Sequence, residues 1–151
     1  RENSNVQGSI YFSSKSFEKN FNGWNDSLRN NYYKEPALVP AMAWLSKGKP
    51  SMPQAAVYTN GNKQAVIDIA HDGKKESNLK YFVVYKQSDG SNSKKIAAIL
   101  PPQTTIKWTD TLDEKDRAVR YWITAVNRTN EESPAREKKL TRGTAQTWSI
   151  Q

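Results

Sequence analysis

The sequence predicts a mainly β protein: an antiparallel β-sandwich with an N-terminal α/β appendage. Two observations lead to this fold class. Tyr121, Ile123 and Ala125 alternate with residues of the opposite face, which is the period of a strand that is at least half buried. Several other short apolar runs are separated by turn signals such as Asn60-Gly61 and Asp89-Gly90. Short strands in a series of this kind are typical of a sandwich.

The chain divides near residues 46–53, where two prolines and a glycine can neither continue a helix nor lie in a central strand. We therefore expect three parts. Residues 1–50 form the appendage and a linker, residues 51–141 form the sandwich, and residues 142–151 form a C-terminal extension.

The appendage is predicted to contain one strand and two short helices. The strand covers residues 8–13. The helices cover residues 14–21 and 25–32, because each has large apolar side chains spaced four residues apart. Asn25 or Asp26 can cap the second helix.

Seven strands are predicted in the sandwich, and their inward faces are assigned by the alternation of apolar residues. The predicted strands cover residues 55–59, 65–70, 79–87, 95–100, 104–109, 119–128 and 136–141. Side chains of matching parity predict a core. That core contains Ile67, Ile69, Tyr81, Val83, Ile106, Trp108, Tyr121, Ile123 and Ala125.

The opposite parity predicts an apolar outer face on two neighbouring strands. Its four residues are Phe82, Val84, Trp122 and Val126. A solvent-facing strand normally alternates apolar with polar side chains, so an apolar cluster of this kind indicates an interface. We expect the apolar segment 36–45 to cover it, either within one chain or in a homodimer of the fragment. Such a cover would make the joint between the two parts rigid.

The strands resemble those of a fibronectin type III domain. The runs 81–86 and 121–127 are similar to strands C and F of such domains, and Leu112 lies where they place a leucine before strand F. Two positions depart from the pattern. Ile69 stands where strand B usually carries a tryptophan, and Val119 stands where a tyrosine often opens strand F. The resemblance implies an immunoglobulin-like fold that serves as a binding or spacing module rather than as an enzyme.

A second resemblance covers residues 8–45. It rests on Gly8-Ser-Ile-Tyr-Phe-Ser-Ser-Lys-Ser16, Asp26-Ser-Leu-Arg29, Tyr33, Pro36-Ala-Leu-Val-Pro40 and Trp44-Leu45. These motifs are similar to the last strand and last helix of the catalytic (β/α)8 barrel in glycoside hydrolase family 10-like proteins. Those are bacterial cell-envelope proteins, often lipoproteins, in which a fibronectin-like domain often follows the barrel.

The second resemblance implies a role and a location. The chain would be a non-catalytic accessory and spacer domain that packs against the catalytic barrel of the same parent protein. The parent would be a glycoside hydrolase of carbohydrate metabolism in the cell envelope, in the periplasm or as an outer-membrane lipoprotein, or outside the cell.

No catalytic residue is predicted in this chain. Barrel glycosidases use two carboxylates at the carboxyl ends of barrel strands. The predicted strand carries none, and Glu18, Asp26 and Glu35 lie in predicted helices or loops. His71 is the single histidine and cysteine is absent, so neither a metal site nor a cofactor is predicted.

Charge and tryptophan content bear on the partners. The net charge of +8 is spread along the chain and interleaved with acidic residues, so no nucleic-acid partner is expected. No run approaches the roughly 18 apolar residues of a membrane span. Trp122 faces outward in the predicted strand. The alternative function is therefore a carbohydrate-binding module, with Trp122 stacking on a sugar of a polysaccharide.

Overall fold

The computed structural model describes residues 10, 14–61, 63–71, 78–143 and 147–150. The chain forms two compact units, Arg1–Pro36 and Ala37–Gln151. The boundary therefore precedes the linker predicted at residues 46–53. The strand predicted over residues 8–13 lies outside the described residues, apart from Ile10. No helix in the described ranges is long and apolar enough to cross a bilayer.

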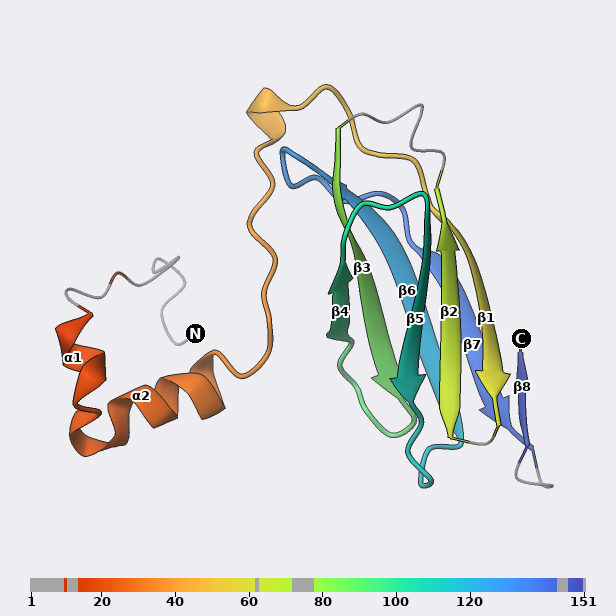
Figure 1. Cartoon of the computed structure of the whole chain (residues 1–151), viewed down its shortest axis with the longest axis horizontal. Coiled ribbons are helices and arrows are strands. Elements are labelled where there is room, and N and C mark those ends of the chain that lie inside the picture. Colours follow the sequence, from red (N-terminus) through yellow and green to blue (C-terminus); the bar gives the residue numbers. More distant parts are fainter. Residues whose placement is uncertain (1–9, 11–13, 62, 72–77, 144–146, 151) are drawn as a thin grey trace. The chain divides into compact units, whose positions relative to one another are not determined.

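The second unit is mainly β and consists of two antiparallel sheets (Figure 1). The three-stranded sheet has the order β1 (Gln54–Asn60), β2 (Gln64–Ala70) and β5 (Thr105–Thr111). The five-stranded sheet has the order β4 (Lys95–Leu100), β3 (Leu79–Ser88), β6 (Ala118–Asn127), β7 (Arg136–Arg142) and β8 (Trp148–Ile150). β8 lies in the predicted C-terminal extension and pairs with β7, so the extension contributes a strand to the sheet.

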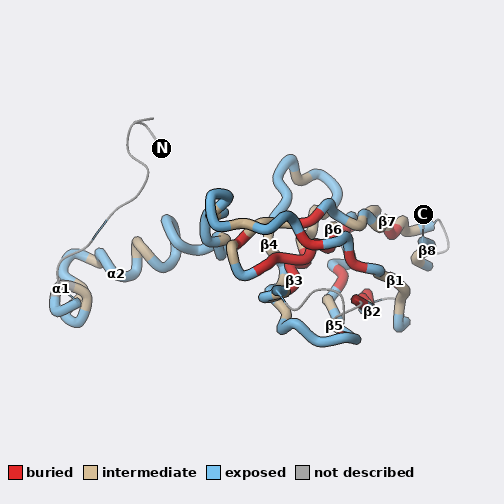
Figure 2. Tube along the Cα trace, turned by 90° about the horizontal axis from the view of Figure 1, so that it is seen from above, coloured by how far each residue is buried: buried red, intermediate tan, exposed pale blue. Residues whose placement is uncertain are grey.

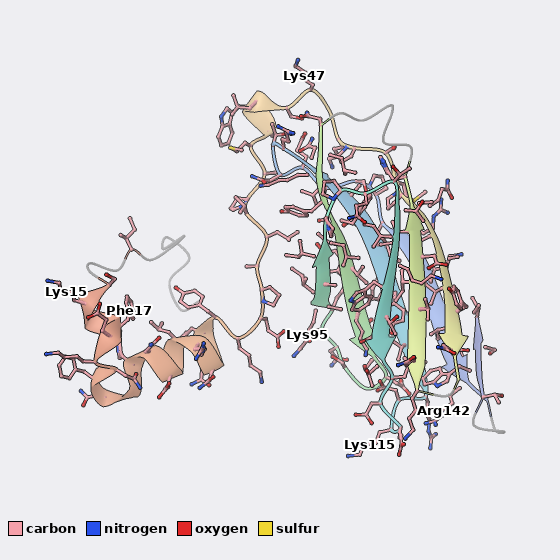
Figure 3. All side chains as sticks on the ribbon, viewed as in Figure 1. Lys15, Phe17, Lys47, Lys95, Lys115 and Arg142 are labelled. Atoms are coloured by element: carbon pink, nitrogen blue, oxygen red, sulfur yellow. The ribbon has the colours of Figure 1, made fainter. Side chains whose placement is uncertain are left out.

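The two sheets enclose one hydrophobic core, which Figure 2 shows as a central band of buried residues. Figure 3 draws the side chains of both sheets. The three-stranded sheet supplies Val57, Ala65, Ile67, Ile69 and Ile106. The five-stranded sheet supplies Phe82, Val84, Val119, Tyr121, Ile123, Ala125 and Leu140. Leu112 is also in the core, and Trp108 packs against it while partly buried.

The predicted facing of β3 is wrong. Phe82 and Val84 are fully buried in the core, whereas the sequence predicted Tyr81 and Val83 there. β3 has an unbroken apolar run, so both of its faces look like core faces. The pairing with β6 decides: Phe82 lies opposite Ala125 and Val84 opposite Ile123. Directly opposed residues share a face of the sheet.

A polar contact joins β5, an edge strand of the three-stranded sheet, to the inner strands β3 and β6 of the other sheet. Tyr121 has no exposed surface, and its hydroxyl donates to Asp110 Oδ2 at 2.6 Å. The ammonium of Lys86 lies 2.6 Å from the same carboxylate oxygen. Burial, followed by this hydrogen bond, raises the pKa of the Tyr121 hydroxyl. β5 is thereby tied to β6 and β3.

The first unit contains short helical segments. They are α1 (Lys15–Glu18), the 3-10 turn η1 (Phe21–Gly23), α2 (Trp24–Ser27) and the π-helical turn η2 (Leu28–Tyr32). The start of α2 differs from the prediction. Asn20 Oδ1 accepts the backbone N–H groups of Asn25 (2.8 Å) and Asp26 (3.3 Å), so Asn20 satisfies the free N–H groups of the first turn. Asn25 and Asp26 lie inside the helix and do not cap it.

Replacing Phe82 tests whether its side chain lies in the core, as the structure shows, or on the outer face, as the sequence predicted. Phe82→Ala should lower the free energy of unfolding by about 3–5 kcal/mol, because it opens a cavity in the core. Ile99→Ala is the control, since Ile99 lies on the outer face opposite Val83 and is 47% exposed. That change should cost no more than about 1 kcal/mol. Urea denaturation of both variants measures the difference, and equal losses would contradict the assignment.

Replacing Tyr121 by Phe should make stability less sensitive to alkaline pH. A pKa that folding raises gives stability that is complete below the unfolded value of about 10 and is lost as pH rises above it. Tyr121→Phe should therefore cost roughly 1.5–3 kcal/mol at neutral pH, through the lost bond to Asp110. The deficit should shrink above about pH 10. Denaturation at several pH values measures it, and a constant deficit would count against this role.

Candidate functional site

The outer face of the β3–β6 pair is the surface on which the sequence placed an interface. Of the four predicted residues, Trp122 and Val126 lie on this face, whereas Phe82 and Val84 lie in the core. Val126 is 1% exposed, so the chain itself already covers it. The four residues therefore do not form one exposed apolar patch.

A partly buried carboxylate, that of Glu132, lies in the middle of this face. Glu132 Oε1 accepts hydrogen bonds from the Tyr85 hydroxyl and from Thr124 Oγ1, both at 2.6 Å. Burial, and then this hydrogen bond, raises the pKa of the Tyr85 hydroxyl. Burial and the nearby charge of Glu132 also raise the pKa of Tyr81. Each hydroxyl therefore stays protonated, and Tyr85 is fixed as a hydrogen-bond donor.

An aromatic pair lies beside this carboxylate. Tyr85 and Trp122 are directly opposed on β3 and β6, and both are only partly buried. The Lys94 ammonium lies 4.2 Å from the centroid of the Tyr85 ring and 5.5 Å from that of Trp122. Both distances are within the range of a cation–π contact. Lys94 itself is exposed, and its long side chain lies over both rings on the solvent side.

The end of the face formed by the C-terminus of β6 is a polar junction centred on Asn127. Asn127 is 2% exposed, and its Oδ1 accepts from Thr129 N (3.0 Å), Thr129 Oγ1 (2.8 Å) and Glu131 N (2.9 Å). Its Nδ2 donates to Gly48 O at 3.0 Å and to Glu131 Oε2 at 3.2 Å. One amide thus shapes the turn after β6 and binds the segment that precedes β1.

That preceding segment, residues 37–48, is anchored to the turn by further polar contacts. Met42 N donates to Thr129 O at 2.8 Å, and Asn130 Nδ2 donates to Pro40 O at 3.4 Å. The Ser46 hydroxyl donates to the Glu131 carboxylate. Hydrogen bonds of the segment's backbone and of the Ser46 hydroxyl therefore hold it against the turn.

The segment was predicted to cover the outer face of β3 and β6 with its apolar side chains, and the exposed ones among them do not do so. Three of its large apolar side chains are exposed to solvent: Val39 is 56% exposed, Trp44 79% and Leu45 60%. Leu38 and Met42 are partly buried. Val39 flanks a proline, and Trp44 and Leu45 lie in the short 3-10 turn η3 (Ala43–Leu45). The segment is hydrogen-bonded to the turn through its backbone, and Val39, Trp44 and Leu45 are exposed to solvent.

The opposite end of the face contains a polar hollow of about 290 Å³. It is lined by Gln87, Ser88, Asp89, Gly90, Ser91, Ala118, Arg120 and Lys139. Arg120 and Lys139 are directly opposed on β6 and β7. The hollow therefore has two adjacent cations on its wall and the turn after β3 as its rim.

The carboxylates considered from the sequence lie in the first unit, outside any described strand. Glu18, Asp26 and Glu35 are all exposed, and Asp26 accepts a 2.7 Å hydrogen bond from Asn20 Nδ2. His71 is buried, with Nε2 3.3 Å from Ser51 Oγ and its ring 5.6 Å from that of Phe82. Within the described ranges, no group of three His, Cys, Asp or Glu side chains could hold a metal ion.

The polar junction and the hollow were missed at the sequence level. Asn127 and Thr129 follow a buried strand directly, which is a signal for side-chain hydrogen bonds that shape a turn. No sequence signal marks the hollow, because Arg120 and Lys139 become neighbours only through the β6–β7 register.

Comparison with known proteins finds sequence similarity to a glycosyl hydrolase. No family model matches the chain. It is 29% identical over 136 residues to the glycosyl hydrolase YngK of Bacillus subtilis (strain 168), covering 88% of this chain and 26% of that protein. The chain is therefore similar to part of a glycosyl hydrolase. It spans about a quarter of the length of the curated relative it matches.

Similar solved structures include the spore cortex lytic enzyme SleM of Clostridium perfringens, at 23% identity and a TM-score of 0.46, over 61% of this chain and 28% of that one. The glycoside hydrolase domain of Endo-D from Streptococcus pneumoniae R6 has 16% sequence identity and a TM-score of 0.47. That match covers 64% of this chain and 16% of the other. A superoxide reductase from Archaeoglobus fulgidus has 10% sequence identity and a TM-score of 0.46. That match covers 70% of this chain and 99% of the other. At these scores the three likenesses carry no functional argument.

Removing the Asn127 amide should loosen the junction. Asn127→Ala should lower the free energy of unfolding by roughly 2–4 kcal/mol, because several buried groups lose their partners at once. Hydrogen exchange of residues 40–48 should become faster, since Gly48 loses its contact. Asn92→Ala, in an exposed turn, is the control and should stay within about 0.5 kcal/mol of the parent. Similar exchange rates in the two variants would show that Asn127 does not anchor the segment.

Proposed function

We propose that this chain is a non-catalytic accessory and spacer domain of a glycoside hydrolase-like protein, and that it packs against the catalytic barrel of the same parent. The observation that carries this proposal is the exposure of seven large apolar side chains between residues 21 and 45, in a chain that is similar to about a quarter of a glycosyl hydrolase. They are Phe21, Trp24, Tyr32, Tyr33, Val39, Trp44 and Leu45. Such side chains usually mark a contact surface.

The strand order supports a fibronectin type III-like identity for the second unit. In immunoglobulin-like sandwiches, strands A, B and E lie in one sheet and strands C, F and G in the other. β1, β2 and β5 take the places of A, B and E, and β3, β6 and β7 those of C, F and G. β4 pairs with β3, and β8 adds an outer strand next to β7.

The first unit supports its assignment as the end of a larger domain. None of its described residues from 14 to 36 is buried. Its exposed aromatic side chains are Phe21 (64%), Trp24 (53%), Tyr32 (78%) and Tyr33 (59%). Two short helices cannot bury such surfaces by themselves. We infer that the rest of a barrel covers them in the parent, whose location in the bacterial envelope or outside the cell follows from the family resemblance.

The segment 37–48 supplies the spacer side of the joint. Its backbone is fixed to the 127–131 turn by hydrogen bonds, while Trp44 and Leu45 point outward. A segment that is fixed on one side and apolar on the other suits a rigid joint. Burying these two side chains would contribute about 1.5–3 kcal/mol each on full burial.

The catalytic part of the proposal is tested by assaying the pure chain on aryl-glycosides and polysaccharides. No turnover is expected, because the carboxylates Glu18, Asp26 and Glu35 lie exposed and do not form a pair at the ends of barrel strands. Turnover that is lost in Asp26→Ala or Glu35→Ala would overturn it.

The packing part is tested by hydrogen exchange on the isolated chain and on the full parent protein. Residues 37–48 should exchange more slowly in the parent, since Trp44 and Leu45 become covered there. Trp44→Ala should remove much of that protection, whereas Met52→Ala, at a residue 36% exposed outside the segment, should not. Equal exchange in chain and parent would argue for a flexible tether.

A further inference from the structure

Arg120 and Lys139 form an unusual pair on the outer face. They are directly opposed on neighbouring strands, where like charges destabilise a sheet. In the part of the chain that the structure describes, neither side chain makes an ion pair. An anion bound between them would turn this repulsion into two charge-assisted hydrogen bonds.

The hollow beside them has the size and lining of a small polar site. Its volume of about 290 Å³ is close to the lower end of the range for small-molecule sites, roughly 300–1,000 Å³. Gln87 Nε2 donates to Ser91 O at 2.7 Å and Ser88 Oγ to Asp116 Oδ2 at 3.0 Å, so the rim is held in place. Asp89 is the carboxylate on the lining. The hollow can take one sugar unit and offers it many polar groups.

An aromatic surface continues from the hollow along the same face. Trp122 lies two residues after Arg120 on β6, at a rise of roughly 6.6–6.8 Å, and Tyr85 lies two residues before Gln87 on β3. Tyr85 and Trp122 are directly opposed and partly exposed. Indole and phenol rings present flat apolar surfaces on which the apolar face of a pyranose can pack.

We propose that this end of the five-stranded sheet binds an acidic polysaccharide. A carboxylate or sulfate of one sugar unit lies in the hollow against Arg120 and Lys139, and the next unit packs on Trp122. Lys94, whose exposed ammonium lies over Trp122 and Tyr85, swings aside and becomes a third cation for the ligand. Glu137, opposite Trp122, limits the number of anionic groups that this end accepts.

The site is compatible with the rigid joint, because the two lie at opposite ends of the same strands. β3 and β6 pair from Leu79↔Asn127 at the joint to Ser88↔Val119 at the hollow. Ten-residue strands span about 30 Å. Figure 3 shows the same separation: Lys47, on the anchored segment, lies at the far end of the sheets from Lys115, on the loop before β6. A polysaccharide can therefore bind while the segment 37–48 stays packed.

The test measures binding of the full chain to four polymers at one fixed salt concentration, by affinity electrophoresis and calorimetry. The probes are polygalacturonate, dextran sulfate, uncharged dextran and a single-stranded oligonucleotide. Polygalacturonate or dextran sulfate should bind, and their comparison shows whether a carboxylate or a sulfate is preferred. Uncharged dextran and the oligonucleotide should not bind.

Three variants locate the binding. Arg120→Ala combined with Lys139→Ala should weaken it at least about tenfold, as should Trp122→Ala, while Trp122→Phe should retain most of it. The matched control is Lys47→Ala combined with Lys49→Ala, which removes the same charge from exposed lysines at the other end and should change affinity less than about twofold. Thermal unfolding of each variant verifies its fold.

Four results would overturn the proposal. They are binding to none of the polymers, equal losses in the Arg120/Lys139 and Lys47/Lys49 variants, unchanged affinity in a folded Trp122→Ala, or tighter binding of the oligonucleotide. The second would assign the binding to the diffuse net charge. The fourth would assign the surface to single-stranded nucleic acid, which also uses cations and aromatic rings. None of these results depends on whether the parent is a hydrolase.

Discussion

The register between β3 and β6 is the constraint on which the rest of the second unit depends. Both strands have ten residues, and their pairing runs through Phe82↔Ala125, Val84↔Ile123 and Tyr85↔Trp122. A slip of one residue would exchange the two faces of β3. Phe82 and Val84 would leave the core, and Tyr85 would lose both Glu132 and its aromatic partner. One register thus sets the hydrophobic core and the outer face together.

The same register determines what each end of the face contains. At one end it brings the last residue of β6, Asn127, beside the start of β3, where its amide organises the turn and holds the segment before β1. At the other end it sets Arg120 opposite Gln87, and the β6–β7 pairing adds Lys139. The polar junction around Asn127 and the charged hollow therefore lie on one pair of strands without overlapping.

The sequence predicted β6 correctly because its two faces differ. Tyr121, Ile123 and Ala125 alternate with residues that include Arg120 and Thr124, so only one facing buries the apolar set. β3 could not be predicted in this way, since its apolar run extends over both faces and its facing follows from the partner strand. Antiparallel sheets, the strand positions and most of the core were therefore predictable from local pattern.

The polar junction and the hollow required three-dimensional information. Asn127 contacts Gly48, which is far away in the sequence, and Arg120 meets Lys139 across a turn whose length does not determine the register. The apolar segment 36–45 was predicted to need a surface, and its part from Pro40 to Leu45 does contact the turn after β6. It does so through its backbone, because the turn after β6 offers carbonyl and amide groups rather than an apolar groove.

Engineered cysteine pairs test the β3–β6 register most directly, since the natural chain has no cysteine to interfere. Gln87 and Arg120 are directly opposed on the outer face, so Gln87→Cys with Arg120→Cys should form a disulfide readily on mild oxidation. Lys86→Cys with Arg120→Cys would be opposed only in the register that places Val83 in the core, and should stay reduced. Rapid cross-linking of the Lys86/Arg120 pair, with none for the Gln87/Arg120 pair, would contradict the register and the core and outer face that follow from it.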